Sequence, residues 1–349
     1  MARLKSRMIY YYDDTEEKRN KGRVKYLLFL LLLTGLLLTT STYAWFTTNR
    51  VVSVEMIDVK VQTEGSLEIS VDGINFKPGV TEQDIIGANS GSYPTSVNQL
   101  PSYIEPVSTV GGLDNRGFMN MYYGDISSND NGDYVIQSEK SVEAEGHGDD
   151  SDGKFIAFDL FLRTTEDKDL YLTDESKVIY NGVSTGTENA IRLAFIIEGN
   201  TPSSSNSSVI QSLYTTDAND VYIWEPNYNT HTTTGISHAR EVYGVNITEN
   251  SANRVPYDGI KAEFSSDLNI TFSLANSSQF PNYFGEVVPK IVTVKDNTDY
   301  IPLWNLKAGI TKLRVYLWLE GQDVDCENNA SVGDLSFRLQ FSTNPSRNA

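Results

Sequence analysis

Apolar and polar residues alternate with a period of two through most of the chain after residue 50, which predicts β-strands buried on one face. The lengths and residue types of these alternating segments are those of β-strands. Helical periodicity is scarce, with one short candidate near Ser207–Thr215. Many antiparallel strands without intervening helices predict an all-β fold, an antiparallel β-sandwich or jelly roll. The clearest strand segments are Phe155–Leu162, Ile191–Ile197, Leu268–Leu274, Leu313–Leu319 and Leu335–Phe341.

The first strand of this region contains a break in its alternation. The phase slips at Ile57, and a strand with a β-bulge produces such a slip. Directly afterwards, Asp72-Gly73 between two apolar runs is the signal of a type I′ turn and predicts a hairpin. The apolar positions of the first strand are Val52, Val54, Met56, Val59 and Val61.

Residues 78–154 lose the alternating pattern and are rich in Gly, Ser, Asn and Asp. Such composition predicts a long loop-rich insertion. Strong strand patterns lie on both sides of it, so we expect one sandwich over 45–349, closed by its first and last strands. A boundary between two subdomains is the alternative.

The N-terminal segment has the order of a signal peptide. Basic residues 1–25 precede an apolar run, and a polar stretch from residue 39 ends at Ala44, in the n-region, h-region, c-region order. We expect residues 26–44 to direct export and cleavage to fall between Ala44 and Trp45. The 24 uncharged residues between Lys25 and Arg50 are also enough to span about 30 Å of hydrocarbon, so an uncleaved membrane anchor is the alternative. Either way residues 45–349 lie outside the cell.

Charge is distributed unevenly along the chain. The net charge is −18, but the first 25 residues carry eight Lys and Arg against four Asp and Glu, so the remainder is strongly acidic. An acidic surface repels phosphate backbones, which excludes nucleic acid as a partner. The single cysteine, Cys326, excludes an internal disulfide and a thiolate zinc cluster.

Motifs for catalysis or metal binding are absent from the sequence. The three histidines have no metal-ligand spacing, no Gly-x-Ser-x-Gly motif occurs, and neighbouring acids blunt the Cys326 thiolate. We therefore expect neither an enzyme nor a cofactor. The acidic loop with Asp149, Asp150 and Asp152 is a weak calcium candidate, because hard cations bind carboxylate oxygens, but it does not match a twelve-residue calcium loop.

The end of the leader, Thr-Tyr-Ala-Trp-Phe-Thr at 42–47 after an apolar run containing Gly35, resembles Firmicutes surface proteins of the TasA and camelysin type. The long charged n-region departs from the short one usual in that family. The body resembles uncharacterised clostridial and bacillar surface proteins with the same leader, through residues 190–192, 223–227 and 317–326.

That resemblance implies a jelly-roll subunit of extracellular biofilm fibres, cut by a dedicated ER-type signal peptidase and polymerising when its N-terminal strand completes the next subunit's sheet. The donor strand is then Val51–Val61, although pairing within its own subunit is equally open. We expect an exported, non-enzymatic surface or matrix protein whose partners are the signal peptidase, itself and, through its N-terminus, the membrane.

A surface-anchored module that binds glycan or cell wall is the alternative function. It requires an exposed row of aromatic side chains. Trp318 lies in an alternating strand and is expected in the core, whereas Trp224 leaves a strand into a turn and is expected to cover the edge of the sandwich.

Overall fold

The structure is a computed structural model in which the chain divides into two units, Met1–Ala44 and Trp45–Ala349. In the first unit residues 23–29 are helical. Within the part of the chain that is described, none of the helices has the length and apolar character that crossing a membrane requires. The described residues are 23–29, 52–61, 66–128, 134–143, 146–148, 153–181, 186–251, 254–265, 268, 270, 276–291, 301–326 and 334–344.

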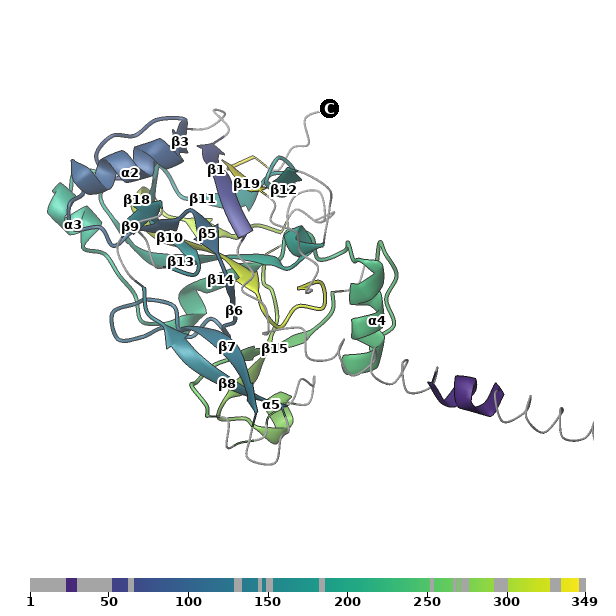
Figure 1. Ribbon diagram of the computed structural model, residues 1–349. Coiled ribbons are helices and arrows are strands. Elements are labelled where there is room, and N and C mark those ends of the chain that lie inside the picture. Colours follow the sequence, from purple (N-terminus) through teal and green to yellow (C-terminus); the bar gives the residue numbers. More distant parts are fainter. Residues whose placement is uncertain are drawn as a thin grey trace, which may run out of the picture. The chain divides into compact units, whose positions relative to one another are not determined.

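The second unit is mostly β and contains several sheets, consistent with a β-sandwich (Figure 1). Two large sheets, named A and B, carry most of its described strands. Sheet A contains β1 (Val52–Val61), β3 (Gly79–Thr81), β5 (Tyr103–Ile104), β11 (Lys168–Leu172), β12 (Lys177–Asn181), β17 (Trp304–Leu306) and β19 (Asp334–Ser342). Sheet B contains β2 (Glu68–Ser70), β4 (Gln99–Pro101), β6 (Pro106–Val107), β9 (Gly146–Gly148), β10 (Ile156–Thr164), β13 (Ile191–Thr201), β14 (Val221–Trp224) and β18 (Gly309–Glu320).

Two smaller two-stranded sheets and a few short helices complete the described elements. The small sheets pair β7 (Met121–Ser128) with β8 (Tyr134–Ser141), and β15 (Tyr257–Ile260) with β16 (Phe284–Val287). The helices are α2 (Glu82–Ser90), α3 (Ser207–Gln211), α4 (Thr233–Val242), α5 (Asn276–Gln279) and the 3-10 turns Thr187–Asn189 and Ala218–Asp220.

Four of the five clearest predicted strands are confirmed, as β10, β13, β18 and β19. They form the centre of the two sheets, with β18 antiparallel to both β10 and β13. The fifth, Leu268–Leu274, lies almost wholly outside the described residues. The short helical candidate near residue 207 is confirmed as α3.

The main apolar core is made by side chains of both large sheets. Phe195 of β13 and Phe341 of β19 meet edge to face in it, with ring centroids 5.7 Å apart. The outer face of sheet B is buried as well, because Met121 of β7 and Tyr257 of β15 pack with Trp318 of β18. Trp318 is therefore a core residue, as predicted. Strand β18 is consequently buried on both faces along its whole length.

The predicted bulge in the first strand is confirmed. In the pairing of β1 with β19, Val54 lies opposite Leu335 and Met56 opposite Ser336, so Glu55 has no partner of its own. The extra residue changes which side chains face the core. Val52 and Val59 are therefore both buried although their spacing is odd.

The predicted type I′ turn at Asp72-Gly73 is wrong in type. The chain does reverse there, since Ile69 and Lys77 exchange backbone hydrogen bonds, but the loop between them is longer than two residues. Gly73 has a φ of +69° whereas Asp72 does not have a positive φ, and a type I′ turn needs both. The Asp72 carboxylate instead organises the loop by accepting the backbone N–H of Ile74 and Asn75, each at 2.8 Å.

The segment 78–154, expected as a loop-rich insertion, contains β3 to β9 and α2 among its described residues. Most of these strands have only two or three residues, too few for an alternation to be visible in the sequence. They add to the edges of strands that the sequence does reveal: β3 and β5 pair with β1, and β4 pairs with β10.

Candidate functional site

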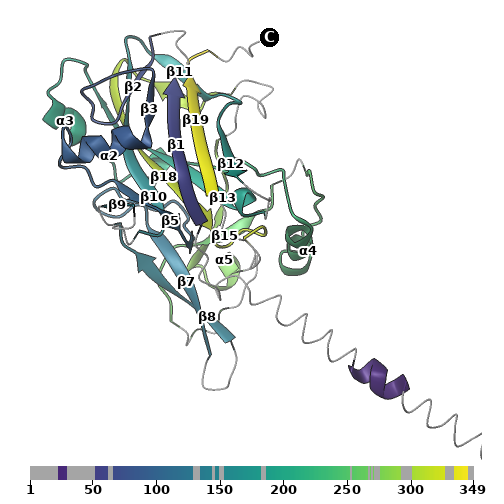
Figure 2. The same ribbon diagram turned by 45° about the horizontal axis from the view of Figure 1, so that its top comes forward.

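Strand β1, the predicted donor strand, lies inside sheet A (Figure 2). One of its edges pairs in parallel with β19, and the other pairs antiparallel with β3 and β5. Backbone hydrogen bonds therefore hold it on both sides within its own chain. The first and last described strands of the body are neighbours, as the expectation of a sandwich closed by these strands requires.

The apolar side chains of β1 enter the main core. Val52, Val59 and Val61 are buried there, and Val54 is half-buried against it. The backbone of Met56 belongs to the strand, but its side chain lies outside the described residues. Because the strand supplies both a row of hydrogen bonds and a row of core side chains, its removal would leave a groove lined by β19 on one side and by β3 and β5 on the other.

Other residues singled out in the sequence are placed only in part. Ala44, Trp45 and the calcium candidates Asp149, Asp150 and Asp152 lie outside the described residues. Cys326 is buried in the main core, as expected of a structural thiol. Trp224 is also fully buried, at the end of β14.

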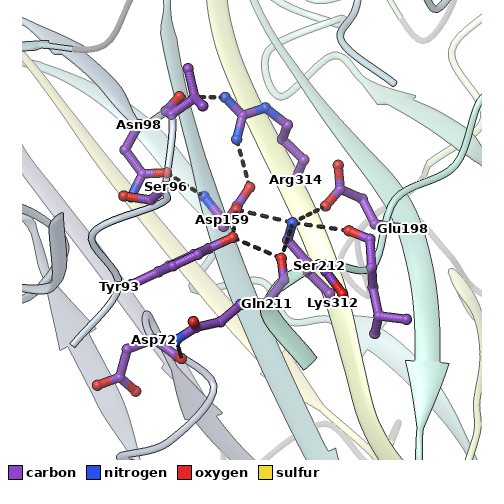
Figure 3. A network of polar contacts seen from close by, with 12 residues as sticks. Asp72, Tyr93, Ser96, Asn98, Asp159, Glu198, Gln211, Ser212, Lys312 and Arg314 are labelled. Carbon is purple, nitrogen blue, oxygen red and sulfur yellow. Dashed lines mark hydrogen bonds and ion pairs between the residues drawn. The ribbon is translucent and has the colours of Figure 1, made fainter. Parts of the chain in front are cut away.

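A group of charged side chains lies on the outer face of sheet B, and we name it the Lys312 cluster (Figure 3). It consists of Asp159 from β10, Glu198 from β13, and Lys312 and Arg314 from β18. At most 8% of any of these four side chains is exposed to solvent. Charges are buried this deeply only when they are paired, because leaving water costs them solvation.

Asp159 is the centre of the cluster. Its Oδ1 accepts a hydrogen bond from Nη1 of Arg314 at 2.6 Å, and its Oδ2 accepts one from the Tyr93 hydroxyl at 2.6 Å. The Lys312 Nζ lies 3.2 Å from the same Oδ2 and 2.7 Å from Oε2 of Glu198. Figure 3 shows Lys312 and Arg314 both reaching from β18 to this carboxylate, Arg314 to Oδ1 and Lys312 to Oδ2.

The pKa values of the two carboxyl groups beside Lys312 are shifted in opposite directions. Burial opposes ionisation of Asp159, but Lys312 and Arg314 outweigh it and hold the pKa of this carboxyl below its usual value. For Glu198, burial and the adjacent Asp159 carboxylate raise the pKa to about 7. Two acids whose pKa values are driven apart are a common arrangement where one of them carries a proton for the other.

A second buried group, the Arg192 cluster, comprises Arg192, Glu225, Asp323 and Glu320. The Arg192 guanidinium donates to Oε1 of Glu225 at 2.9 Å and forms an ion pair with Asp323. Removing one partner of such a pair leaves an uncompensated buried charge, at a cost of about 3–5 kcal/mol. These contacts join the end of β14 to the turn that follows β18.

His231 and Asp325 form a buried pair that looks like part of a catalytic triad. Nδ1 of His231 lies 2.8 Å from Oδ2 of Asp325, while Oδ1 accepts the backbone N–H of Thr232 at 2.8 Å at the start of α4. Nε2 of His231 has no hydrogen-bond partner within the described ranges, so no nucleophile there is hydrogen-bonded to it. The pair instead attaches the N-terminus of α4 to the segment that follows β18.

Within the described residues, no group of three or more His, Cys, Asp or Glu side chains is arranged to hold a metal ion. The acids of the two clusters already have cationic or hydrogen-bonding partners from the protein. Chemically, the Lys312 cluster contains an amine and two carboxyl groups in a site from which water is largely excluded.

The sequence does contain a signal for these clusters, in the form of charged residues within apolar strand segments. Asp159, Arg192 and Arg314 are charged residues inside otherwise apolar strands. A charge at such a position is buried on one of the two faces and therefore needs a partner on a neighbouring strand. The partner cannot be named without the strand order, which places residues 159 and 314 opposite each other.

Comparison with protein-family models, with curated proteins and with solved structures finds no match to this chain.

Proposed function

We propose that this chain is an exported, non-enzymatic structural protein of the cell surface or extracellular matrix, which assembles into fibres through β1. The position of β1 is the observation that supports this proposal. It is the first described strand after the hydrophobic segment, and its pairing partner β19 is the last.

The way β1 is attached makes exchange between subunits geometrically simple. It is joined to the rest of the body only through its C-terminal end, so it leaves or enters its slot without threading a loop. The same hydrogen bonds and core contacts form when an identical strand comes from a neighbouring subunit, as in domain swapping. Concentration and the reach of the connecting segment then decide which strand occupies the slot.

The finer features of the proposal concern the fold and the leader. We infer that sheets A and B form a jelly-roll-like sandwich, and that residues 26–44 direct export. A signal peptidase would cut between Ala44 and Trp45 and free the segment that precedes β1. Without the cut, the same segment would anchor the body to the membrane, with the acidic part outside.

A glycan-binding function receives less support. Three of the four tryptophans, Trp224, Trp304 and Trp318, belong to the described residues, and all three are buried. Tyr103 and Tyr214 are exposed, but they belong to separate segments of the chain. A row of stacking side chains, which a sugar platform needs, is not formed by these tryptophans.

A cross-linking experiment tests the exchange of β1. Asp58 and Arg338 are register partners in β1 and β19, and their side chains are partly exposed. Secreted protein carrying Asp58→Cys together with Arg338→Cys is oxidised and run on a non-reducing denaturing gel. If β1 is exchanged, each disulfide joins two subunits and a ladder of covalent oligomers appears.

The controls are the two single-cysteine variants, which form dimers at most, because Cys326 is buried. A cross-linked band at monomer mass only, from material that sizes as monomer, would show that β1 pairs within its own chain and would refute assembly through it. N-terminal sequencing of the same material checks the leader, with Trp45 expected as the first residue. Monomeric protein retained by an immobilised glycan would favour the alternative function.

A further inference from the structure

We propose that Lys312 and Asp159 become joined by an intramolecular amide bond, with Glu198 carrying the protons that the reaction moves. The bond would link β18 to β10 within one chain. This inference goes beyond the proposed function and does not depend on it, because it concerns one buried site whether or not β1 is exchanged.

The three reacting groups are already in contact. The Lys312 Nζ lies 3.2 Å from Oδ2 of Asp159 and 2.7 Å from Oε2 of Glu198. The backbone carbonyls of Gln211 and Leu213 also accept from this Nζ, at 3.1 and 3.0 Å, and fix its position. Reacting groups held this close gain the rate advantage of an intramolecular reaction.

The sheet places these side chains on one face by its register. Asp159 lies opposite Arg314, and Phe161 lies opposite Lys312, so the amine and the carboxyl are diagonal neighbours on adjacent strands. On the other side of β18, the register with β13 shifts between Ile197 and Gly199, and Glu198 is the extra residue. Bulges re-aim side chains, and this one sets Glu198 beside Lys312.

The reaction balances without any co-reactant. The Lys312 ammonium and the Asp159 carboxylate contain the atoms of one amide and one water. The Nζ gives up two protons and forms a bond to Cγ of Asp159; the bond from Cγ to Oδ2 breaks, and Oδ2 leaves with both protons as water. Glu198 takes each proton from Nζ and passes it on, so it ends unchanged. Each chain reacts once, on itself.

Asp159 and Glu198 raise the pKa of Lys312 against the effect of burial, so its ammonium must pass a proton to Glu198 before Nζ attacks. The surroundings stabilise the charge that develops during the attack, and they favour the product. Arg314 donates to Oδ1, the oxygen that carries negative charge as the nitrogen adds, and Tyr93 donates to Oδ2, the oxygen that leaves. Burial and Asp159 raise the pKa of Glu198 to about 7, so that this carboxyl exchanges a proton readily near neutral pH. Formation of the amide replaces two buried charges by one neutral group and releases a water, which burial favours.

Mass spectrometry tests the bond directly. We expect the intact full chain, expressed and purified, to weigh less than its sequence mass by one water. Trypsin should then release peptide 155–163 joined to peptide 308–314, with Lys312 uncleaved. Lys312→Arg keeps the positive charge but should restore the full mass.

A matched control is Lys290→Arg, because the Lys290 Nζ bonds a backbone carbonyl, that of Val221, at 3.2 Å. This variant should still lose one water. Glu198→Gln should slow the loss at least tenfold in protein followed after synthesis. A wild-type chain at full mass, with peptides 155–163 and 308–314 unjoined, overturns the proposal even if no variant folds. Unchanged kinetics in Glu198→Gln would overturn the role of Glu198.

Discussion

Three buried glutamates have pKa values far from their ordinary range. Burial raises the pKa of Glu198, Glu225 and Glu320 to about 7, in each case against the effect of nearby donors or cations. The pKa of Asp72 is shifted in the opposite direction. Burial favours its neutral form, but hydrogen bonds from Ser92, Asn75 and other donors lower its pKa to about 2.

These shifts predict how pH changes the stability of the body. A glutamate whose folded pKa lies above the unfolded value of 4.5 adds stability below pH 4.5, and this stability is lost as the pH rises through about 7. Glu320 is the clearest case, because its carboxylate accepts from Trp318 and Gln322 at 3.0 Å but has no cation in direct contact among the described residues. Replacing it should therefore matter more at high pH than at low pH.

We predict that Glu320→Gln raises the free energy of unfolding, relative to wild type, as the pH increases from 5 to 8. The upper bound of this change is about 3 kcal/mol, since each unit of pKa shift corresponds to about 1.4 kcal/mol. Denaturant unfolding at the two pH values measures it. Glu166→Gln, at an exposed glutamate, is the control and should show no such trend. A difference from wild type that is the same at both pH values would contradict the prediction.

The start of β18 depends on a glycine. Gly309 has a φ of +118°, and a Cβ there would lie 2.4 Å from the carbonyl oxygen of Thr201 in β13. Both the backbone conformation and the close approach of the strands exclude a side chain. Gly87 in α2 is the opposite case, because a Cβ added to it would have no described neighbour within 4 Å.

We predict that Gly309→Ala destabilises the body by at least about 1–3 kcal/mol, the cost of a strained backbone conformation, with the steric clash in addition. Gly87→Ala should instead stabilise it by about 0.5–1 kcal/mol, because alanine is the better helix residue. Thermal or denaturant unfolding of the two variants compares them. Equal effects of the two substitutions would show that the approach of β18 to β13 is not close.

The same elements show how far the sequence predicts the fold. Strands β10, β13, β18 and β19 were visible because each has seven or more residues with suitable side chains, and the bulge in β1 was visible as a change of phase. Strands of two or three residues, such as β5 and β6, leave no periodic signal. Helix α4 was missed because its sequence, Thr-Thr-Gly-Ile-Ser-His-Ala-Arg-Glu-Val, has weak helix formers in its first turns.

The Lys312 cluster was not predictable because it depends on strand order. Asp159, Glu198 and Lys312 are separated in sequence by tens of residues, and nothing in their local patterns pairs them. They meet because β18 lies between β10 and β13. The donor-strand hypothesis, by contrast, came from a resemblance of the leader and stays a prediction.

In sheet A, β1 lies between β19 on one side and β3 and β5 on the other. We predict that a chain starting at residue 62 does not fold alone, and that a synthetic peptide of residues 50–61 restores its folding when added. The peptide would supply the hydrogen bonds to β19 and the core side chains Val52 and Val59. Circular dichroism and a binding titration measure the restoration.

A peptide lacking Asp58 is the matched control. The bulge at Glu55 remains in it, so removing one paired residue shifts the phase, and Val52 and Val59 would no longer face the same side. This control should bind at least tenfold more weakly. A truncated chain that folds without any peptide would contradict the prediction, since sheet A would then be complete without β1.

The parallel pairing of the first strand with the last also determines the order in which the strands of sheet A can pair during folding. Val59 lies opposite Leu339, so under the proposed export, N-terminus first, β1 would emerge long before its own partner. Pairings this distant in sequence form late. During that delay β1 can pair with a neighbouring subunit that has formed the rest of sheet A but whose own β1 position is still empty. The number of chains emerging together, and therefore the rate of secretion, would then govern how much material becomes polymer and how much closes on itself.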